Sequence, residues 1–235
     1  MKYQSFMGGV AVLFVGGAIA KILGAVYRIP LTWILGAEGL GIYQLVFPVF
    51  SLLIVLASSG MPTSISKMTA TRLAHHDYAG VRTVFRVSII TMLIVGVVVS
   101  ALVLGLASVI ANVQGNALGT LGYVGIAPAI LFVCLLSVFR GYFQGHSNMI
   151  PTALSQIVEQ AGKLIFGLLF AYLLVGYGIE YGAFGAILGV TLSEIIAVTV
   201  LYVIYLKNRQ PAPNYSQNGL QSTLHLSLIH ISEPT

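Results

Sequence analysis

Residues 87–113, VSIITMLIVGVVVSALVLGLASVIANV, contain no charged side chain. A helix that crosses a membrane needs about 20 mainly apolar residues, and this stretch supplies them without a break. Its apolar residues run on continuously instead of alternating with polar ones, which argues against a strand of a membrane barrel. We therefore predict a membrane-spanning helix at residues 87–113.

The rest of the chain continues this pattern. Of its 235 residues, 57% are hydrophobic and 7% charged, and the mean hydropathy is +0.96. Soluble domains carry about 25% charged residues, so the composition argues against a soluble enzyme or a nucleic-acid-binding protein. We predict an all-α membrane protein with six transmembrane helices, at residues 6–29, 42–59, 87–113, 121–139, 150–175 and 181–206.

Basic residues are distributed unevenly between these spans. Eight of them lie at the N-terminus, in the second-to-third and fourth-to-fifth connections or in the tail, and the other three connections hold none. Because cytoplasmic loops are enriched in Lys and Arg, we expect both ends of the chain in the cytoplasm. Residues 63–75, which follow Pro62, are predicted to form a short basic amphipathic helix on that side. A solvated loop is the alternative.

The C-terminal part of the chain changes character. We assign residues 1–209 to a transmembrane lobe and residues 210–225 to a polar linker. Residues 226–235, LSLIHISEPT, resemble a translated sequencing adapter, so we leave them out of the fold prediction. We expect the natural protein to continue into a second part that this chain lacks.

Five ionisable residues fall inside the predicted spans. An ionised side chain at the bilayer centre costs on the order of 3 kcal/mol, so such residues usually face protein or water. The three cations and two carboxylates predict a polar cavity with an excess of positive charge, which suits a phosphate or pyrophosphate group. These residues are Lys21, Arg28, Lys163, Glu159 and Glu194.

Each of these charges also has a structural alternative. Glu159 and Lys163 have the i,i+4 spacing of an ion pair within one helix. Arg28 can extend to the outer headgroups, and Glu194 can be protonated or hydrogen-bonded inside the helix bundle. Lys21 lies deep in its span, and that span supplies no acidic partner.

The sequence contains no recognisable catalytic arrangement. Cys134 is the single cysteine, which excludes an internal disulfide and a cysteine-based metal cluster. The phosphate-binding loop G-x-x-x-x-G-K-[ST] is absent, so we expect neither an ATPase nor a cofactor. Pro48 and Pro128 lie inside predicted spans, where proline kinks a helix.

Several motifs together resemble one family. The chain is similar to the stage V sporulation protein B group, in the polysaccharide-biosynthesis and lipid II flippase branch of the multidrug/oligosaccharidyl-lipid/polysaccharide exporter superfamily. The resemblance covers about residues 5–206. It is carried by residues 21–31 (KILGAVYRIPL), 35–44 (LGAEGLGIYQ), 59–67 (SGMPTSISK), 139–145 (FRGYFQG), 148–152 (NMIPT), 155–160 (SQIVEQ) and 182–189 (GAFGAILG).

This resemblance implies two similar lobes with 12–14 spans in all, of which the six predicted spans form the N-terminal lobe. It implies a cavity between the lobes and transport by alternating access. Lys21 and Arg28 are the positions nearest to the family's cationic residues on the first span. Lys163 stands where the group more often has arginine, and Glu159 matches the glutamate of its Ser-Gln-x-x-Glu-Gln pattern.

The resemblance implies a flippase for undecaprenyl-pyrophosphate-linked sugars in the bacterial cytoplasmic membrane, not an enzyme. Its expected partners are the lipid-linked oligosaccharide, membrane lipids and the missing C-terminal lobe, and no nucleic acid. Lys21, Arg28 and Lys163 are the candidate substrate-binding residues, while Glu159 and Glu194 are candidates for ion coupling or for orienting the cavity. Two alternatives stay open: a cation-coupled multidrug antiporter of the same superfamily, and a membrane polysaccharide polymerase.

Overall fold

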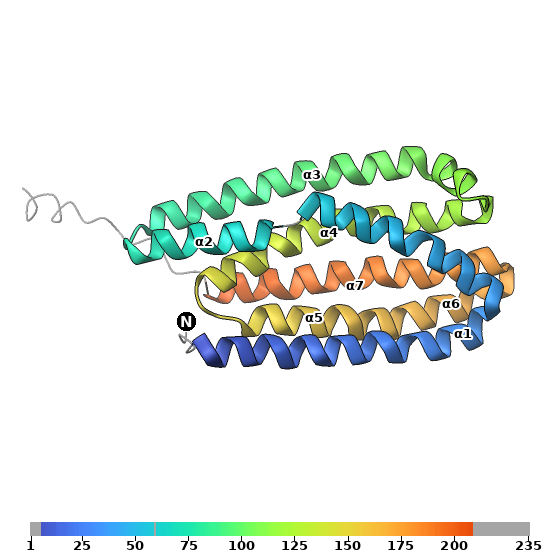
Figure 1. The fold of residues 1–235 in the computed structure, drawn as a ribbon, viewed down its shortest axis with the longest axis horizontal. Helices are drawn as coiled ribbons and strands as arrows, with labels where there is room; N and C mark the ends of the chain where they lie inside the picture. Colours follow the sequence, from blue (N-terminus) through green and yellow to red (C-terminus); the bar gives the residue numbers. More distant parts are fainter. Residues whose placement is uncertain (1–5, 59, 209–235) are drawn as a thin grey trace, which may run out of the picture.

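The computed structural model describes residues 6–58 and 60–208, and in these ranges every regular element is a helix (Figure 1). The all-α prediction is therefore confirmed, whereas the predicted linker at 210–225 and the segment 226–235 lie outside the described residues. The α-helices are α1 Phe6–Ser58, α2 Met61–Ala74, α3 Tyr78–Val113, α4 Thr120–Gly145, α5 Ile150–Gly162, α6 Leu168–Leu174 and α7 Ile179–Asn208. A π-helix, η2 Lys163–Gly167, joins α5 to α6, and short 3-10 turns lie at η1 Ala117–Gly119 and η3 Val175–Tyr177.

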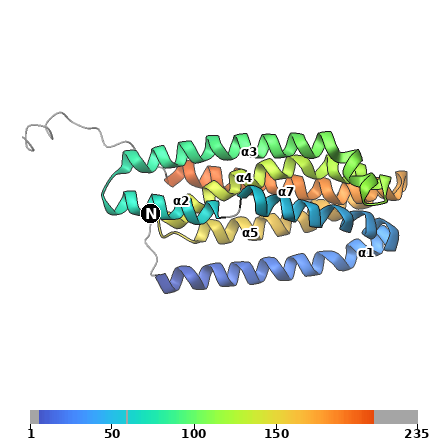
Figure 2. The same cartoon turned by 45° about the horizontal axis from the view of Figure 1, so that its top comes forward.

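Helix α1 reverses its direction at Gly36. The backbone there has φ 65° and ψ −172°, a conformation that residues with a Cβ rarely adopt. Residues 6–35, here called the first arm, run along the bundle, and residues 37–58, the second arm, run back obliquely (Figures 1 and 2). The first two predicted spans therefore fall on different arms of one element.

Five stretches of the described chain are long and apolar enough to cross a membrane. They are Met7–Ala74, Tyr78–Val113, Ala117–Gly145, Ile150–Tyr177 and Ile179–Asn208. By length and composition the count is thus five, where the sequence predicted six, because both arms of α1 fall in the first stretch.

Helix α4 lies at the centre of the bundle and packs against α2, α3 and α7. Its contact with α2 depends on two small residues spaced four apart. A Cβ on Gly141 would stand 2.8 Å from the carbonyl oxygen of Pro62, and one on Gly145 would stand 2.6 Å from the Thr69 Cβ. The predicted helix after Pro62 is confirmed, and the two glycines allow its backbone to approach α4 closely.

The outer face of α3 is strongly apolar. Val97 and Leu102 are about half exposed, and Val113 is 82% exposed. A contiguous apolar surface of this kind is unfavourable in water and is typical of contact with lipid chains. The exposed side chains therefore support a multi-pass membrane protein, as the composition predicted.

Both ends of the described chain lie at the end of the bundle where α2 is found (Figure 1). The start of α1 and the end of α7 share that end with the start of α3. This arrangement is the one that two termini on the same side of a membrane require. That this side is the cytoplasmic one stays a prediction.

Asp77 caps α3 and joins it to α2. Its Oδ1 accepts a hydrogen bond of 2.7 Å from the Gly80 backbone N–H, and its Oδ2 accepts one of 2.8 Å from Arg72. The Gly80 amide, together with the Arg72 guanidinium, holds the pKa of the Asp77 carboxyl below its usual value. The charged form of Asp77 is therefore the one that stabilises the α2–α3 connection.

We expect Gly189→Ala to destabilise the fold strongly, because a Cβ there would stand 2.2 Å from the Gly167 backbone nitrogen. Gly105→Ala is the matched control, since a Cβ on that helical glycine meets nothing within 4 Å. Thermal unfolding of the intact protein in detergent should show a lower midpoint for the Gly189 variant and no decrease for the control. Equal midpoints for the two variants would contradict this packing.

Acidification should loosen the start of α3. A carboxylate whose pKa is lowered by folding stabilises the native state above its ordinary pKa, and that contribution is lost as the pH falls through the lowered value. Hydrogen exchange at the Gly80 amide should therefore accelerate in acid. Asp77→Asn keeps an acceptor for the cap but cannot titrate, so exchange in this variant should lack the acid-dependent step. An unchanged step in Asp77→Asn would assign the titration to another group.

Candidate functional site

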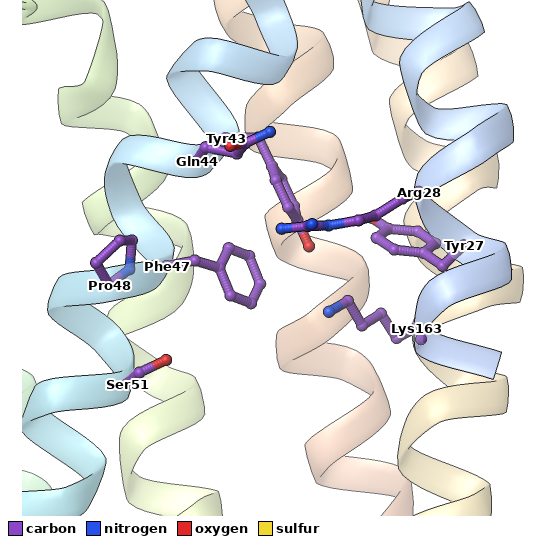
Figure 3. Close-up of a pocket in the computed structure, with 9 residues that line it drawn as sticks. Tyr27, Arg28, Tyr43, Gln44, Phe47, Pro48, Ser51 and Lys163 are labelled. Carbon is purple, nitrogen blue, oxygen red and sulfur yellow. The ribbon is translucent and has the colours of Figure 1, made fainter. Parts of the chain in front are cut away.

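A cavity of about 330 Å³ opens between the two arms of α1 and the start of the π-helix η2. Figure 3 shows its lining side chains, with Arg28 and Lys163 reaching toward the second arm. The two cations come from segments far apart in the sequence, and the reversal at Gly36 brings the second arm opposite them. The lining residues are Gly24, Tyr27, Arg28, Tyr43, Gln44, Phe47, Pro48, Ser51 and Lys163.

Lys163 is held in this cavity by aromatic rings. Its Nζ lies 5.0 Å from the centre of the Tyr27 ring and 4.6 Å from that of Phe47. A cation over an aromatic face is attracted by the ring's negative charge density, an interaction of about 0.5–2 kcal/mol. Lys163 is also the first residue of the π-helix, a wide turn that often occurs at functional sites. Within residues 6–58 and 60–208, no carboxylate is in salt-bridge contact with its ammonium, which lies at the cavity where an anion could meet it.

The second arm presents polar groups to the same cavity. Pro48 has no N–H, so the carbonyl of Gln44, four residues earlier, lacks the helical donor it would otherwise have. The Gln44 and Ser51 side chains line the cavity beside this proline. The Tyr43 hydroxyl is buried and has no hydrogen-bond partner among the described residues. The cavity therefore combines two cations with uncharged polar groups.

Glu159 pairs with Arg140 and not with Lys163. Its Oε2 lies 2.9 Å from an Arg140 guanidinium nitrogen, and the Nε of Arg140 donates to the Ser155 hydroxyl at 3.0 Å. The other carboxylate oxygen of Glu159, Oε1, accepts a hydrogen bond of 3.2 Å from the side-chain amide of Gln160. The i,i+4 pairing with Lys163 that the spacing allowed is thus replaced by a link between α4 and α5.

Glu194 of α7 lies against this ion pair. Its residue is 3% exposed, and its Oε2 finds no hydrogen-bond partner within the described part of the chain. Its charged neighbours are Glu159, Arg140 and Lys163. The two acidic candidates and Lys163 therefore form one charged cluster with Arg140, in which Glu194 is buried and the other three are partly buried, and Lys163 connects this cluster to the cavity.

Lys21 is placed differently from the other candidates. It lies on the exposed surface of the first arm, two helical turns before Arg28 on the same side of the helix, and it does not line the cavity. The structure thus brings Arg28 and Lys163 to one cavity and leaves Lys21 outside it. A binding role for Lys21 stays a prediction.

Sequence reasoning missed several residues of this site. Arg140 was assigned to a loop, because the predicted span ended one residue before it, although it lies within α4. The Phe139-Arg-Gly motif at the edge of an apolar run was the available signal. The roles of Tyr27 and Phe47 carry no signal in sequence, since aromatic residues are ordinary in membrane helices.

Comparisons with known proteins agree with this architecture. The family described as "Polysaccharide biosynthesis protein" matches residues 6–228. Stage V sporulation protein B of Bacillus subtilis (strain 168) is 31% identical, over 100% of this chain and 46% of that protein. Lipid II flippase MurJ of the same organism is 30% identical, over 88% of this chain and 40% of its own length. The chain thus spans less than half the length of these relatives.

Solved structures share the fold. A multidrug resistance MATE family transporter of the MOP superfamily in an outward-facing conformation has a TM-score of 0.72 at 20% identity, covering 91% of this chain and 52% of that one. The inward-facing conformation gives a TM-score of 0.68 at 21% identity, covering 84% and 46%. The fold is therefore that of about half of a MATE transporter. With the match over residues 6–228, the chain belongs to the polysaccharide biosynthesis protein family.

Proposed function

We propose that this chain forms one lobe of a flippase that carries a lipid-linked sugar pyrophosphate across the bacterial cytoplasmic membrane. The observation that carries the proposal is the pair Arg28 and Lys163 in one cavity whose lining contains no carboxylate. Two cations in a partly desolvated site attract an anionic group and form charge-assisted hydrogen bonds to it. The family and the relative with a flippase name support the same substrate class.

In this proposal Arg28 and Lys163 contact the pyrophosphate, and Lys21 attracts it along the first arm. Glu159 and Glu194 orient the cations or take part in ion coupling, because both lie in the cluster that includes Lys163. Uncharged donors such as the Tyr43 hydroxyl complete the site. The chain itself performs no covalent chemistry on the substrate.

The proposed membrane arrangement has six spans, since each arm of α1 crosses separately. A second lobe, which this chain lacks, would supply the opposite wall of the cavity and bring the total to 12–14 spans. The end that carries α2 would face the cytoplasm, because its basic residues Lys67, Arg82 and Arg86 lie there. Alternating access would then expose the cavity to each side in turn.

A multidrug antiporter is the second candidate function. The rings of Tyr27 and Phe47 and the MATE fold favour it, because organic cations bind well to aromatic faces. The ammonium of Lys163 already occupies those faces, however, and Arg28 adds a second positive charge. Efflux of a fluorescent organic cation by the intact protein, abolished by Tyr27→Ala, would favour this candidate over the flippase.

We expect Arg28→Ala and Lys163→Ala in the intact protein to abolish complementation of a flippase-deficient strain. Each removes a cation that the proposed substrate contacts, and each should lower the flipping rate at least tenfold. Lys21→Ala should also reduce complementation. Lys207→Ala is the control, because it removes the same charge from an exposed position in the last turn of α7. Normal growth of the Arg28 and Lys163 variants at normal protein levels would reject the assignment.

Breaking the ion pair between α4 and α5 should reduce stability. Removing one partner of a buried pair typically costs about 3–5 kcal/mol, because the remaining charge is left without compensation. Arg140 and Glu159 are about one-fifth exposed, so we expect the lower end of this range. Unfolding in detergent should show that the double variant loses less stability than the sum of the losses in Arg140→Ala and Glu159→Ala. Strict additivity would mean that the pair contributes no coupling.

A further inference from the structure

A second cavity lies at the α2 end of the bundle, apart from the proposed transport site. Its volume is about 220 Å³, and it opens between the beginning of α3 and the end of α7, which lie at the same end of the molecule (Figure 1). Its lining residues are Arg82, Phe85, Arg86, Ile89 and Tyr205, here called the Arg82–Arg86 groove.

The groove carries two positive charges without compensation. Arg82 and Arg86 are spaced i,i+4 and therefore project from the same side of α3. The salt bridges found in the described ranges join Arg72 to Asp77 and Arg140 to Glu159, so neither groove arginine has an acidic partner there. An anion is the ligand that this charge distribution favours.

Aromatic rings form one wall of the groove. The Phe85 ring stacks on the Tyr205 ring, with 4.6 Å between centroids and 19° between planes. Tyr142 of α4 supports both rings from below, at 4.9 Å from Phe85 and 5.3 Å from Tyr205. Tyrosine is common where one end of a site is apolar and the other is wet, as at a membrane interface.

The groove sits where the polar end of α3 meets its apolar stretch. The uncharged run begins directly after Arg86. Ile89, Leu93 and Val97 continue the same face of α3 at helical spacing, and the last two are 42% and 49% exposed. A polar head at the arginines would therefore lead into an apolar track. A basic region followed by an apolar surface suits an amphiphilic ligand better than a small free anion.

We propose that the Arg82–Arg86 groove binds the phosphate of an anionic phospholipid, with one acyl chain lying along Ile89, Leu93 and Val97. Guanidinium groups recognise phosphate through paired N–H donors, which a lysine ammonium does not reproduce. Basic pockets between transmembrane helices on the cytoplasmic side are a known type of lipid headgroup site. This site is independent of the proposed transport cavity and uses none of its residues.

The test measures binding of short-chain phosphatidylglycerol to the intact protein in neutral detergent by calorimetry. Arg82→Gln with Arg86→Gln should weaken binding at least tenfold, and the corresponding double lysine variant should fall in between. The matched control is Lys67→Gln with Lys207→Gln, which removes the same charge from exposed positions outside the groove. That control should change the affinity less than twofold.

Two competitors identify the source of the phosphate. Inorganic phosphate and short-chain phosphatidylcholine should both bind much more weakly than phosphatidylglycerol, the first for lack of an acyl chain and the second for its neutral headgroup. Equal weakening by the glutamine and control variants would overturn the proposal, as would equal affinity for phosphatidylcholine. Inorganic phosphate that binds as tightly as the lipid would show an anion site without lipid recognition. The thermal midpoint of each variant confirms that it is folded.

Discussion

The link between Arg140 and Glu159 is the interaction on which the rest of the site depends. Two charges in the membrane-spanning part of a bundle are tolerated because each satisfies the other, and Ser155 and Gln160 complete their hydrogen bonds. Because Glu159 pairs with Arg140, the ammonium of Lys163 has no carboxylate in salt-bridge contact in the part of the chain that the structure describes, and it lies against the rings of the cavity. The electrostatics of the cavity therefore follow from a contact that lies outside it.

The family match assigns the chain to the polysaccharide biosynthesis protein family, and its fold is that of about half of a MATE transporter. The site adds chemical detail, because Lys163 is held by two aromatic rings and shares the cavity with Arg28 and with neutral polar groups. A ligand with concentrated negative charge gains from such an environment, whereas an organic cation would compete with Lys163 for the same faces. This difference is the reason why the proposed function has an anionic substrate.

Much of the fold could be predicted from sequence, and the reasons are physical. The run after Arg86 is too long and too apolar for anything but a membrane helix, and Pro62 marks the start of α2 correctly. Residues 30–41 were predicted as the connection between the first two spans, but in the structure this stretch is helical on both sides of the reversal at Gly36. Gly36, Gly39 and Gly41 all lie in it, and sequence spacing does not show which glycine breaks the helix. The predicted spans place Lys163 and Glu194 inside the bundle, and both lie there in the structure. The partner of Glu159 depends on which helices meet, whereas sequence spacing identifies only neighbours on the same helix.

The π-helix has a further consequence for the segment that follows it. A wide turn takes up one residue more than an α-helical turn, which shifts the rotational phase of α6 relative to α5 by about 100°. Residues before Lys163 and residues after Gly167 therefore do not share one helical periodicity, although they belong to one apolar stretch. A single helical pattern drawn across residues 150–175 therefore misplaces the side chains after Gly167 by about 100° around the helix axis.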